Sequence, residues 1–391
     1  MTNIALPTDR LKNLDFAAHN AEVDRVWAAR NAHHPIRVPV IVGTNTRYFV
    51  FNAGANPERI AFRPYIEDPD VMFDQALRFQ RWTRFNILQD AALGAPAAWT
   101  IAPDFQNFYE AAWFGCEVHY FDDQVPDTLP DFAADPERVM VHSLPDPFGG
   151  LMSKALEYYE YFVARAARED FLGIPIKVNP PWCGLGTDGP FTVACNLFGP
   201  DFVCETLLAE PERLRKLLEF ITEATIGRMA AWRRRFGTPV PQEWFSFADD
   251  SIALISTPQY VEHVLPFHRA LCAALATPGP RTIHLCGDAT RHFPTLQKLL
   301  NIQSFDTGFP VDFAALRKAL GPAAAINGGP HVDLLLRGTV DQVYQECRRI
   351  LQSGICEGGF FTLREGNNLA PYTPLENIEA MYRAAKAFGQ Y

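Results

Sequence analysis

The segment Arg281-Thr282-Ile283-His284-Leu285-Cys286-Gly287-Asp288 predicts a short strand that stops at Gly287. Side chains alternate between the two faces of a strand, so His284 and Cys286 share one face and the intervening aliphatic residues take the other. A neutral imidazole and a thiolate on one face form half of a zinc site. The alternative is a buried cysteine beside a hydrogen-bonded core histidine, which is the more common outcome for an isolated His-x-Cys pair.

Strand and helix patterns alternate outward from this segment along most of the chain. Strands are expected at residues 37–43, 98–101, 139–143, 175–179, 240–248, 281–286, 302–306, 323–327 and 359–363. Helices are expected at residues 15–35, 68–86, 151–169, 210–235, 256–276, 296–300, 339–351 and 373–388, and capping boxes open the last two. This alternation is typical of an α/β fold with a parallel sheet. The nine strand candidates exceed the eight places of a barrel, and the weak one at 98–101 is the expected miscount.

The pattern predicts a single (β/α)8 TIM barrel over residues 37–391, preceded by an N-terminal helical extension over residues 1–36. No Gly-x-Gly-x-x-Gly follows an early strand, which argues against a nucleotide-binding sheet. In a barrel the carboxyl ends of the strands open into the active-site mouth. Residues 180–200, rich in Gly and Pro, are expected to form a long loop that covers this mouth.

Composition restricts the compartment and the partners. The 391 residues carry a net charge of −10 without a basic run, which argues against nucleic acid as a partner. Eight scattered cysteines without a Cys-x-x-Cys motif indicate a reduced, intracellular protein. The first 14 residues lack an apolar signal core, and no stretch reaches 18 apolar residues, so we expect a cytoplasmic protein without a membrane partner.

Several motifs carry a resemblance to a known family. They are His284-Leu285-Cys286-Gly287, Asn327-Gly328-Gly329-Pro330 and the segment 367–378, with support from Asp249-Asp250 and from residues 114–118. With these motifs the chain resembles the uroporphyrinogen decarboxylase superfamily, and more closely its branch of corrinoid-dependent zinc methyltransferases. The resemblance implies a (β/α)8 barrel, methyl transfer and a zinc ion. The chain has no Asp-x-His-x-x-Gly corrinoid signature, so a corrinoid would be carried by a separate protein.

Two departures from the family pattern restrict the function. The Arg-rich segment with which uroporphyrinogen decarboxylases hold the acidic tetrapyrrole has no counterpart in residues 37–52, which argues against tetrapyrrole decarboxylation. The zinc methyltransferases carry a second cysteine just after the last strand, and that position falls near Asn367 here. Cys356 precedes the last strand and is therefore at the wrong end of a barrel. The remaining ligands must come from other strands.

The candidate site residues fall into three groups. Metal ligands are expected at His284, Cys286, Asp306 and Glu243, with an orienting or helix-capping role as the alternative for Asp306 and a buried ion pair as the alternative for Glu243. Catalytic groups are expected at Asp250, His142 and Asp306, with a structural histidine as the alternative for His142. Of the pair Asp249 and Asp250, one is expected to be a helix cap or surface acid and the other to face the mouth. Substrate contacts are expected at Asp188, Phe191, Trp182, Trp244, Asn327 and Asn367, where core rings or ordinary loop residues are the alternatives.

These expectations leave three functions open. The first is a metal-dependent methyltransferase, or demethylase, that moves a methyl group between a small substrate and a corrinoid protein. The second is a decarboxylase, a lyase acting on a small organic acid. The third is a non-catalytic barrel that binds a ligand. A homodimer is compatible with each of the three.

Overall fold

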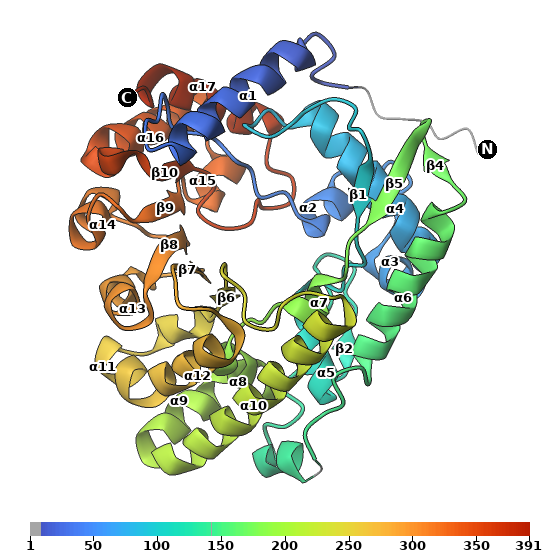
Figure 1. Ribbon diagram of the computed structural model, residues 1–391, viewed down its shortest axis with the longest axis vertical. Helices are drawn as coiled ribbons and strands as arrows, with labels where there is room; N and C mark the ends of the chain where they lie inside the picture. Colours follow the sequence, from blue (N-terminus) through green and yellow to red (C-terminus); the bar gives the residue numbers. More distant parts are fainter. Residues whose placement is uncertain (1–8, 142) are drawn as a thin grey trace. The chain divides into compact units, whose positions relative to one another are not determined.

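The computed structural model describes residues 9–141 and 143–391, and its chain divides into two units. Unit 1 comprises Met1–Ile101, Ala166–Lys177 and Thr307–Tyr391, and unit 2 comprises Ala102–Arg165 and Val178–Asp306. Each unit mixes helices with short strands (Figure 1). The fold class is therefore mixed α/β, as the alternation of patterns predicted. The division at residue 36 and the closure of the strands into one barrel stay predictions.

Unit 2 is built around parallel strands. β6 (Ser246–Ala248) pairs with β7 (Arg281–Leu285), and β7 is followed in the sheet by β8 (Ile302–Thr307). Phe305 of β8 stacks on Phe293 with ring centroids 4.9 Å apart, so apolar packing covers one face of these strands. A two-stranded antiparallel ribbon, β2 (Val118–His119) with β3 (Asp127–Thr128), completes the strands described in this unit.

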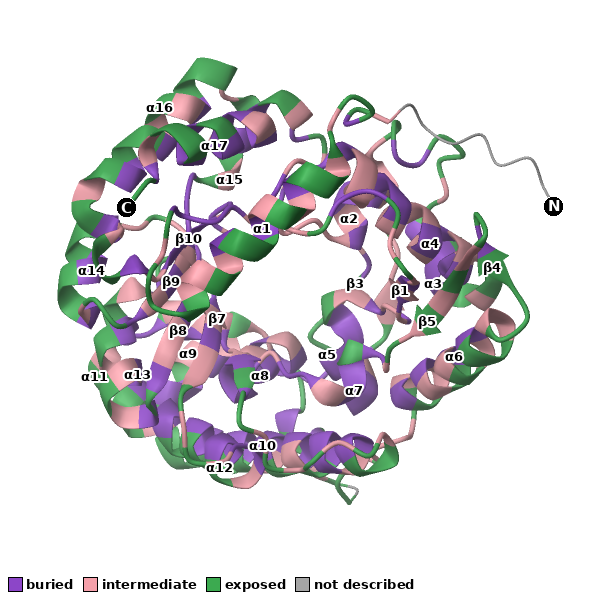
Figure 2. Cartoon of the chain, turned by 45° about the horizontal axis from the view of Figure 1, so that its top comes forward, coloured by how far each residue is buried: buried purple, intermediate pink, exposed green. Residues whose placement is uncertain are grey.

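Helices make up most of the rest of unit 2. They are η1 (Gln106–Phe108), α5 (Tyr109–Phe114), η2 (Pro136–Met140), α6 (Leu151–Ala166), α7 (Trp182–Leu185), α8 (Pro190–Phe198), α9 (Pro200–Ala209), α10 (Pro211–Arg235), η3 (Asp250–Leu254), α11 (Thr257–Gln259), η4 (Tyr260–Val264), α12 (Leu265–Leu275), η5 (Thr290–His292) and α13 (Phe293–Leu300). The long helix α10 has a buried stripe and an exposed one (Figure 2). Its buried positions recur at helical spacing, which is what directs one face into the core.

Unit 1 contains the remaining elements. Its helices are α1 (Phe16–Asn31), α2 (Thr46–Phe51), α3 (Phe62–Glu67), α4 (Pro69–Asn86), α14 (Phe313–Leu320), α15 (Val332–Arg337), α16 (Val340–Ile350), η6 (Leu351–Ile355), η7 (Glu357–Gly359) and α17 (Leu375–Phe388). β9 (Ala325–Gly328) and β10 (Phe361–Leu363) pair in parallel, and β1 (Trp99–Ile101), β5 (Ile174–Val178) and β4 (Asp170–Phe171) form a second sheet in that order. Across residues 9–141 and 143–391, none of the helices has the length and apolar character needed to cross a membrane.

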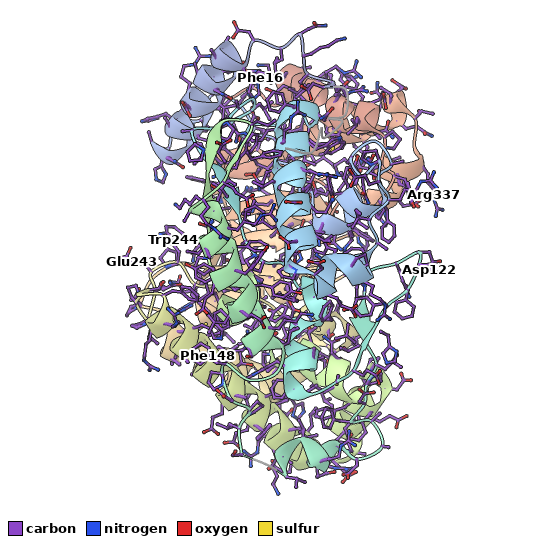
Figure 3. All side chains as sticks on the ribbon, turned by 90° about the vertical axis from the view of Figure 1, so that its right-hand side faces the viewer. Phe16, Asp122, Phe148, Glu243, Trp244 and Arg337 are labelled. Atoms are coloured by element: carbon purple, nitrogen blue, oxygen red, sulfur yellow. The ribbon has the colours of Figure 1, made fainter. Side chains whose placement is uncertain are left out.

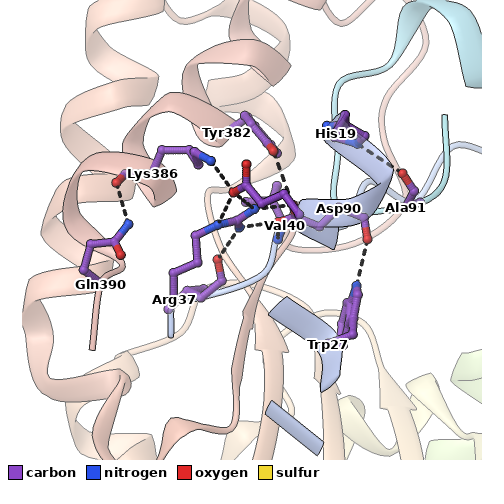
Figure 4. Close-up of polar contacts among 11 residues, drawn as sticks. His19, Trp27, Arg37, Val40, Asp90, Ala91, Tyr382, Lys386 and Gln390 are labelled. Carbon is purple, nitrogen blue, oxygen red and sulfur yellow. Dashed lines mark hydrogen bonds and ion pairs between the residues drawn. The ribbon is translucent and has the colours of Figure 1, made fainter. Parts of the chain in front are cut away.

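The strand predicted at residues 37–43 is only a bridged, buried segment. Val40 bridges β10 at Leu363, but the N–H of Val40 donates to Asp90 Oδ2 at 2.7 Å rather than to a second strand. Arg37, which is 3% exposed, closes the arrangement with two 2.6 Å contacts from its guanidinium to the Asp90 carboxylate (Figure 4). Side chains thus replace one side of the strand ladder, which explains why the pattern of a buried strand appears without a regular strand.

Four other predictions of local structure are wrong. The segment 98–101, expected to be the miscounted strand, contains β1 (Trp99–Ile101). The strand expected at residues 139–143 is replaced by the 3-10 helix η2, which has Pro136 in its first turn and leaves Val141 69% exposed. The loop expected at residues 180–200 is largely helical, because Gly189 and Pro190 mark the start of α8. Thr373 forms no capping box, since its hydroxyl donates to Ala370 O at 2.8 Å. The capping box at Thr339 is confirmed.

Candidate metal centre

Three segments of unit 2 meet at the carboxyl end of β7. Ala248, the last residue of β6, lies opposite His284 in the parallel register. The acids that follow β6 therefore reach the same edge as Cys286, which follows β7. Asp306, near the end of β8, lies on the other side of His284. The sheet register thus brings together residues that are separated by tens of positions in the sequence.

The side chains of this edge form a connected polar cluster. His284 Nδ1 lies 2.6 Å from Asp306 Oδ2, and His284 Nε2 lies 2.9 Å from Cys286 Sγ. The backbone N–H of Cys286 donates to Asp250 Oδ1 at 2.6 Å. Potential ligand atoms of Asp250, His284 and Cys286 all lie within 4.8 Å of one another. An ionised carboxylate only accepts hydrogen bonds, so Asp306 fixes the proton on Nδ1 and leaves Nε2 turned toward the thiol.

The protonation of this cluster depends on the contacts of His284. Burial lowers the pKa of His284, but hydrogen bonds to Asp306 and Cys286 oppose it and raise that pKa to about 11. Burial raises the pKa of the Cys286 thiol, and His284 acts in the opposite direction. The cluster therefore holds protons where a divalent cation would take their place, and metal binding to such ligands releases protons.

The neighbouring acids Asp249 and Asp250 have different surroundings. Asp249 is fully buried and accepts hydrogen bonds from the N–H of Phe191 at 3.1 Å and from the N–H of Thr192 at 2.7 Å, at the start of α8. His268 Nε2 lies 2.8 Å from Asp249 Oδ2, the same oxygen that accepts the Phe191 N–H. Asp249 therefore caps α8 although it lies outside that helix in the sequence. These hydrogen bonds also fix the backbone next to Asp250, whose side chain faces Cys286.

A second buried cluster lies beside the first, and the sequence analysis missed it. Arg228 of α10 forms an ion pair with Glu110 of α5, with side chains 0% and 1% exposed. Glu110 Oε2 also accepts the backbone N–H of Asp188 at 2.7 Å. The one signal in the sequence was a cationic residue on the apolar stripe of α10, between Thr225 and Met229. Its partner, 118 positions away, gave no signal.

The structure does not bring the remaining ligand candidate to this edge. Glu243 is exposed in the turn before β6, because the strand predicted at residues 240–248 covers only Ser246–Ala248. Glu243 and the 71% exposed Trp244 project at the edge of the chain in Figure 3. A metal-binding role for Glu243 therefore has no geometric support in unit 2.

The other predicted substrate and catalytic residues have different surroundings within their own units. Phe191 is fully buried, whereas Trp182 is 59% exposed beside Gly186. Asn327 of β9 and Asn367 after β10 belong to unit 1 and are half-buried. His142 lies outside the described residues, so its catalytic role stays a prediction. Among these candidates, Asp188 lies next to Thr187, whose carbonyl oxygen accepts the N–H of Ala248 at 3.2 Å, so its backbone is at the same edge as His284.

Comparison with known proteins identifies relatives of two activities. A methylated-thiol–coenzyme M methyltransferase of Methanosarcina mazei is 32% identical over 204 residues, which are 50% of this chain and 51% of that protein. A uroporphyrinogen decarboxylase of Anaeromyxobacter dehalogenans is 27% identical over 207 residues, 51% of this chain and 57% of that protein. The chain thus spans about half the length of the curated relatives it matches.

Similarity in fold and in the family sequence profile covers most of the chain. A solved structure titled methyltransferase from Methanosarcina mazei superposes with a TM-score of 0.62 at 20% identity, covering 94% of this chain and 98% of that chain. At this identity the likeness concerns the fold alone. The sequence profile of the family described as Uroporphyrinogen decarboxylase (URO-D) matches residues 22–388. The chain therefore belongs to the uroporphyrinogen decarboxylase (URO-D) family.

Proposed function

We propose that this protein is a metal-dependent methyltransferase that moves a methyl group between a small substrate and a corrinoid carried by a separate protein. The observation that carries the proposal is the convergence of Asp250, His284 and Cys286, with ligand atoms within 4.8 Å of one another. The 32% identity over 204 residues to a methylated-thiol–coenzyme M methyltransferase supports the choice of reaction. A methylated thiol is accordingly the first substrate to test.

The donor set fits a zinc ion. One nitrogen, one sulfur and one oxygen suit zinc better than magnesium or calcium, and three protein ligands leave a position open for substrate. From zinc bond lengths of about 2.0–2.1 Å to nitrogen and about 2.3 Å to sulfur, the two atoms would stand about 3.5 Å apart in a tetrahedral site. His284 Nε2 and Cys286 Sγ are 2.9 Å apart, so modest side-chain rotations would admit the ion.

In this proposal Asp306 orients a ligand and does not bind the ion. Its carboxylate holds the His284 ring by Nδ1, which keeps Nε2 free for the metal, as carboxylates commonly do behind metal-binding histidines. The ion would supply Lewis acidity, lowering the pKa of a substrate thiol or polarising the leaving atom of a methyl donor. Asp250, which also accepts the Cys286 N–H, would fix the distance between the β6 and β7 ligands.

Metal content and methyl transfer, measured on the same preparations, test the proposal. The wild-type protein should contain about one zinc per chain and transfer a methyl group from a methylated thiol to free cob(I)alamin, which is followed by its visible absorbance. His284→Ala should lose both the metal and the activity, while Asp312→Asn, a change at an exposed helix cap in unit 1, should lose neither. A wild-type protein that is active after complete removal of metal would refute the proposal.

Decarboxylation of a small organic acid is the second candidate function. Membership of the URO-D family and the 27% identity to a uroporphyrinogen decarboxylase favour it. The described cluster in unit 2 opposes it for an acidic substrate, because Asp306 and Asp250 place two carboxyl groups beside His284 and Cys286 while Arg228 is already paired with Glu110. Release of carbon dioxide from candidate acids by metal-free protein would establish this function.

Several finer expectations accompany the main proposal. We propose a single (β/α)8 barrel over residues 37–391 with an N-terminal extension over residues 1–36, which an experimental structure would test. A homodimer and a cytoplasmic location are proposed with it. Sedimentation velocity of the purified protein tests the first of these, and fractionation of source cells tests the second.

A further inference from the structure

The ion pair between Arg228 and Glu110 is buried, and burying two charged groups has a free-energy cost that other interactions must offset. Both side chains are removed from water, with exposures of 0% and 1%. Desolvating two charges costs more than their mutual attraction returns unless further hydrogen bonds satisfy the remaining donors and acceptors. Where those hydrogen bonds go therefore indicates what the pair stabilises.

The pair makes its further hydrogen bonds to one short segment, residues 183–188. Arg228 donates to the carbonyl oxygens of Cys183 and, at 2.9 Å, of Gly186. Glu110 Oε2 accepts the Thr187 hydroxyl at 3.2 Å and the backbone N–H of Asp188 at 2.7 Å. Four hydrogen bonds from Arg228 and Glu110 thus hold a segment of six residues.

The opposite side of this segment is fixed to the sheet edge. The N–H of Ala248 at the end of β6 donates to Thr187 O at 3.2 Å, and Ala248 lies opposite His284. A Cβ atom added at Gly189 would lie 2.2 Å from Ala248 O, so the segment passes too close to β6 for a side chain there. Asp188, between Thr187 and Gly189, is therefore held at the same edge as His284.

The electrostatic surroundings of Asp188 agree with this position. Burial raises the pKa of Asp188 well above its usual range, and the negative charges of Glu110 and Asp250 act in the same direction. The positive charges of Arg228 and His284 oppose this shift. This direction agrees with the backbone position of residues 187–189 at the end of β6, between the buried ion pair and His284.

We propose that Arg228 and Glu110 are a positioning pair that holds the Asp188 carboxyl beside the metal centre, where it strengthens binding of the divalent cation. The inference rests on the metal site of the proposed function. It adds a substrate class, because a bound divalent cation favours the ionised form of a nearby carboxyl, and that negative charge favours an uncharged or cationic methyl donor over an anionic one. A thioether or a sulfonium fits this requirement better than a carboxylate-bearing thioether.

Cobalt(II) titration of metal-free protein tests the positioning role without methyl transfer. Asp188→Asn and Glu110→Gln should each weaken cobalt(II) binding about tenfold, the scale for residues that support metal ligands. The double variant should bind as Asp188→Asn alone does, because Glu110 acts through Asp188. If each single variant loses cobalt(II) affinity and the two losses multiply in the double variant, Glu110 acts on the ion directly through its charge, which would overturn the proposal. Unchanged cobalt(II) affinity in Asp188→Asn would overturn it as well.

The chain offers a matched control for the loss of a buried pair. Arg37 and Asp90 in unit 1 are 3% and 0% exposed, and Asp90 also accepts a backbone N–H, that of Val40. Asp90→Asn should lower thermal stability as Glu110→Gln does, but it should leave cobalt(II) affinity unchanged. A loss of affinity in Asp90→Asn equal to that in Glu110→Gln would reduce the effect to general destabilisation and refute the positioning role.

Two further measurements keep the test decisive. If Glu110→Gln does not fold, Thr187→Val removes one hydrogen bond to Glu110 and should weaken cobalt(II) binding severalfold only while Asp188 is present. In the methyl-transfer assay, Asp188→Asn should raise kcat/KM for a carboxylate-bearing thioether relative to an uncharged one by about tenfold. If cobalt(II) binding changes as predicted but the wild type transfers no methyl group, the proposed function alone is refuted. If the Asp188→Asn enzyme is active and keeps the wild-type cobalt(II) affinity and substrate preference, this inference alone is refuted.

Discussion

Replacing Asp306 with Asn separates an orienting residue from a ligand. Asn keeps the size of the side chain but removes the charge that holds His284 Nδ1 at 2.6 Å. The two side chains are 15% and 28% exposed, so the contact is partly shielded from water. A hydrogen bond to a charged group contributes about 1.5–3 kcal/mol. Since about 1.4 kcal/mol corresponds to a factor of ten, zinc affinity should fall about 10- to 100-fold.

Zinc competition with a chromophoric chelator measures this change directly. Asp312→Asn is the matched control, because Asp312 caps α14 through the N–H of Ala315 at 3.0 Å and Asn caps a helix equally well. The orienting role also predicts a change in metal-free protein. There the pKa of His284 should fall from about 11 toward its ordinary value, because one of the two hydrogen bonds that raise it is weakened. Nuclear magnetic resonance titration of the imidazole follows this shift.

Two outcomes would refute the reasoning in opposite directions. Unchanged zinc affinity in Asp306→Asn would show that the contact with His284 does not orient the ligand. Complete loss of zinc, comparable to that in His284→Ala, would show that Asp306 binds the ion itself. The sequence left both roles open for Asp306. In the structure Asp306 Oδ2 contacts His284 Nδ1, while the other ring nitrogen, Nε2, contacts Cys286, and this arrangement favours the orienting role.

Three further changes test the centre and its support. Cys286→Ser should strip the metal yet alter the unfolding free energy of metal-free protein by less than about 1 kcal/mol, and full zinc content by elemental analysis would place the site elsewhere. Gly184→Ala should cost about 1–3 kcal/mol in urea unfolding, because the new Cβ would lie 2.0 Å from the ring of fully buried Trp232; equal stability would mean that the ring moves freely. Burial lowers the pKa of His292 to about 4, below the unfolded value of about 6.5, so its contribution is present above pH 6.5 and is lost as pH falls toward 4. His292→Gln should therefore show less loss of stability between pH 7 and 4.5 than the wild type does in urea unfolding, and parallel losses would contradict this assignment.

Short-range patterns predicted that His284 and Cys286 lie close together, and the structure shows this proximity, while their role as metal ligands stays a prediction. The alternation of a strand over three residues was enough to place His284 and Cys286 together, and their ring nitrogen and sulfur lie 2.9 Å apart. The end of the next strand gave Asp306, which reaches His284 across one strand spacing. These inferences needed only local periodicity and the rule that the carboxyl ends of parallel strands meet at one edge.

Contacts between distant parts of the sequence determined what the patterns could not predict. Trp99 lies in a real strand, although the sequence signal was weak, and its indole N–H donates to Phe171 O at 2.8 Å from 72 positions away. The apolar residues around Val139 show the opposite case, because three residues cannot distinguish a strand from a 3-10 turn that Pro136 begins. Gly and Pro in residues 180–200 marked helix boundaries, and the cap of α8 comes from Asp249.

The same long-range contacts assign different roles to acids that look alike in the sequence. Asp249 accepts N–H groups at the start of α8 and is thereby a structural acceptor. Its neighbour Asp250 accepts the N–H of Cys286, and its half-buried carboxylate is the one that we propose as a metal ligand. Asp306 meets an imidazole nitrogen, and this contact favours the orienting role that we propose for it. For Asp188 it is the backbone that is held, through Glu110, and its carboxyl is left for the site. Since each role follows from the donors that face the acid, exchanging Asp for Asn at these positions tests four different functions with one chemical change.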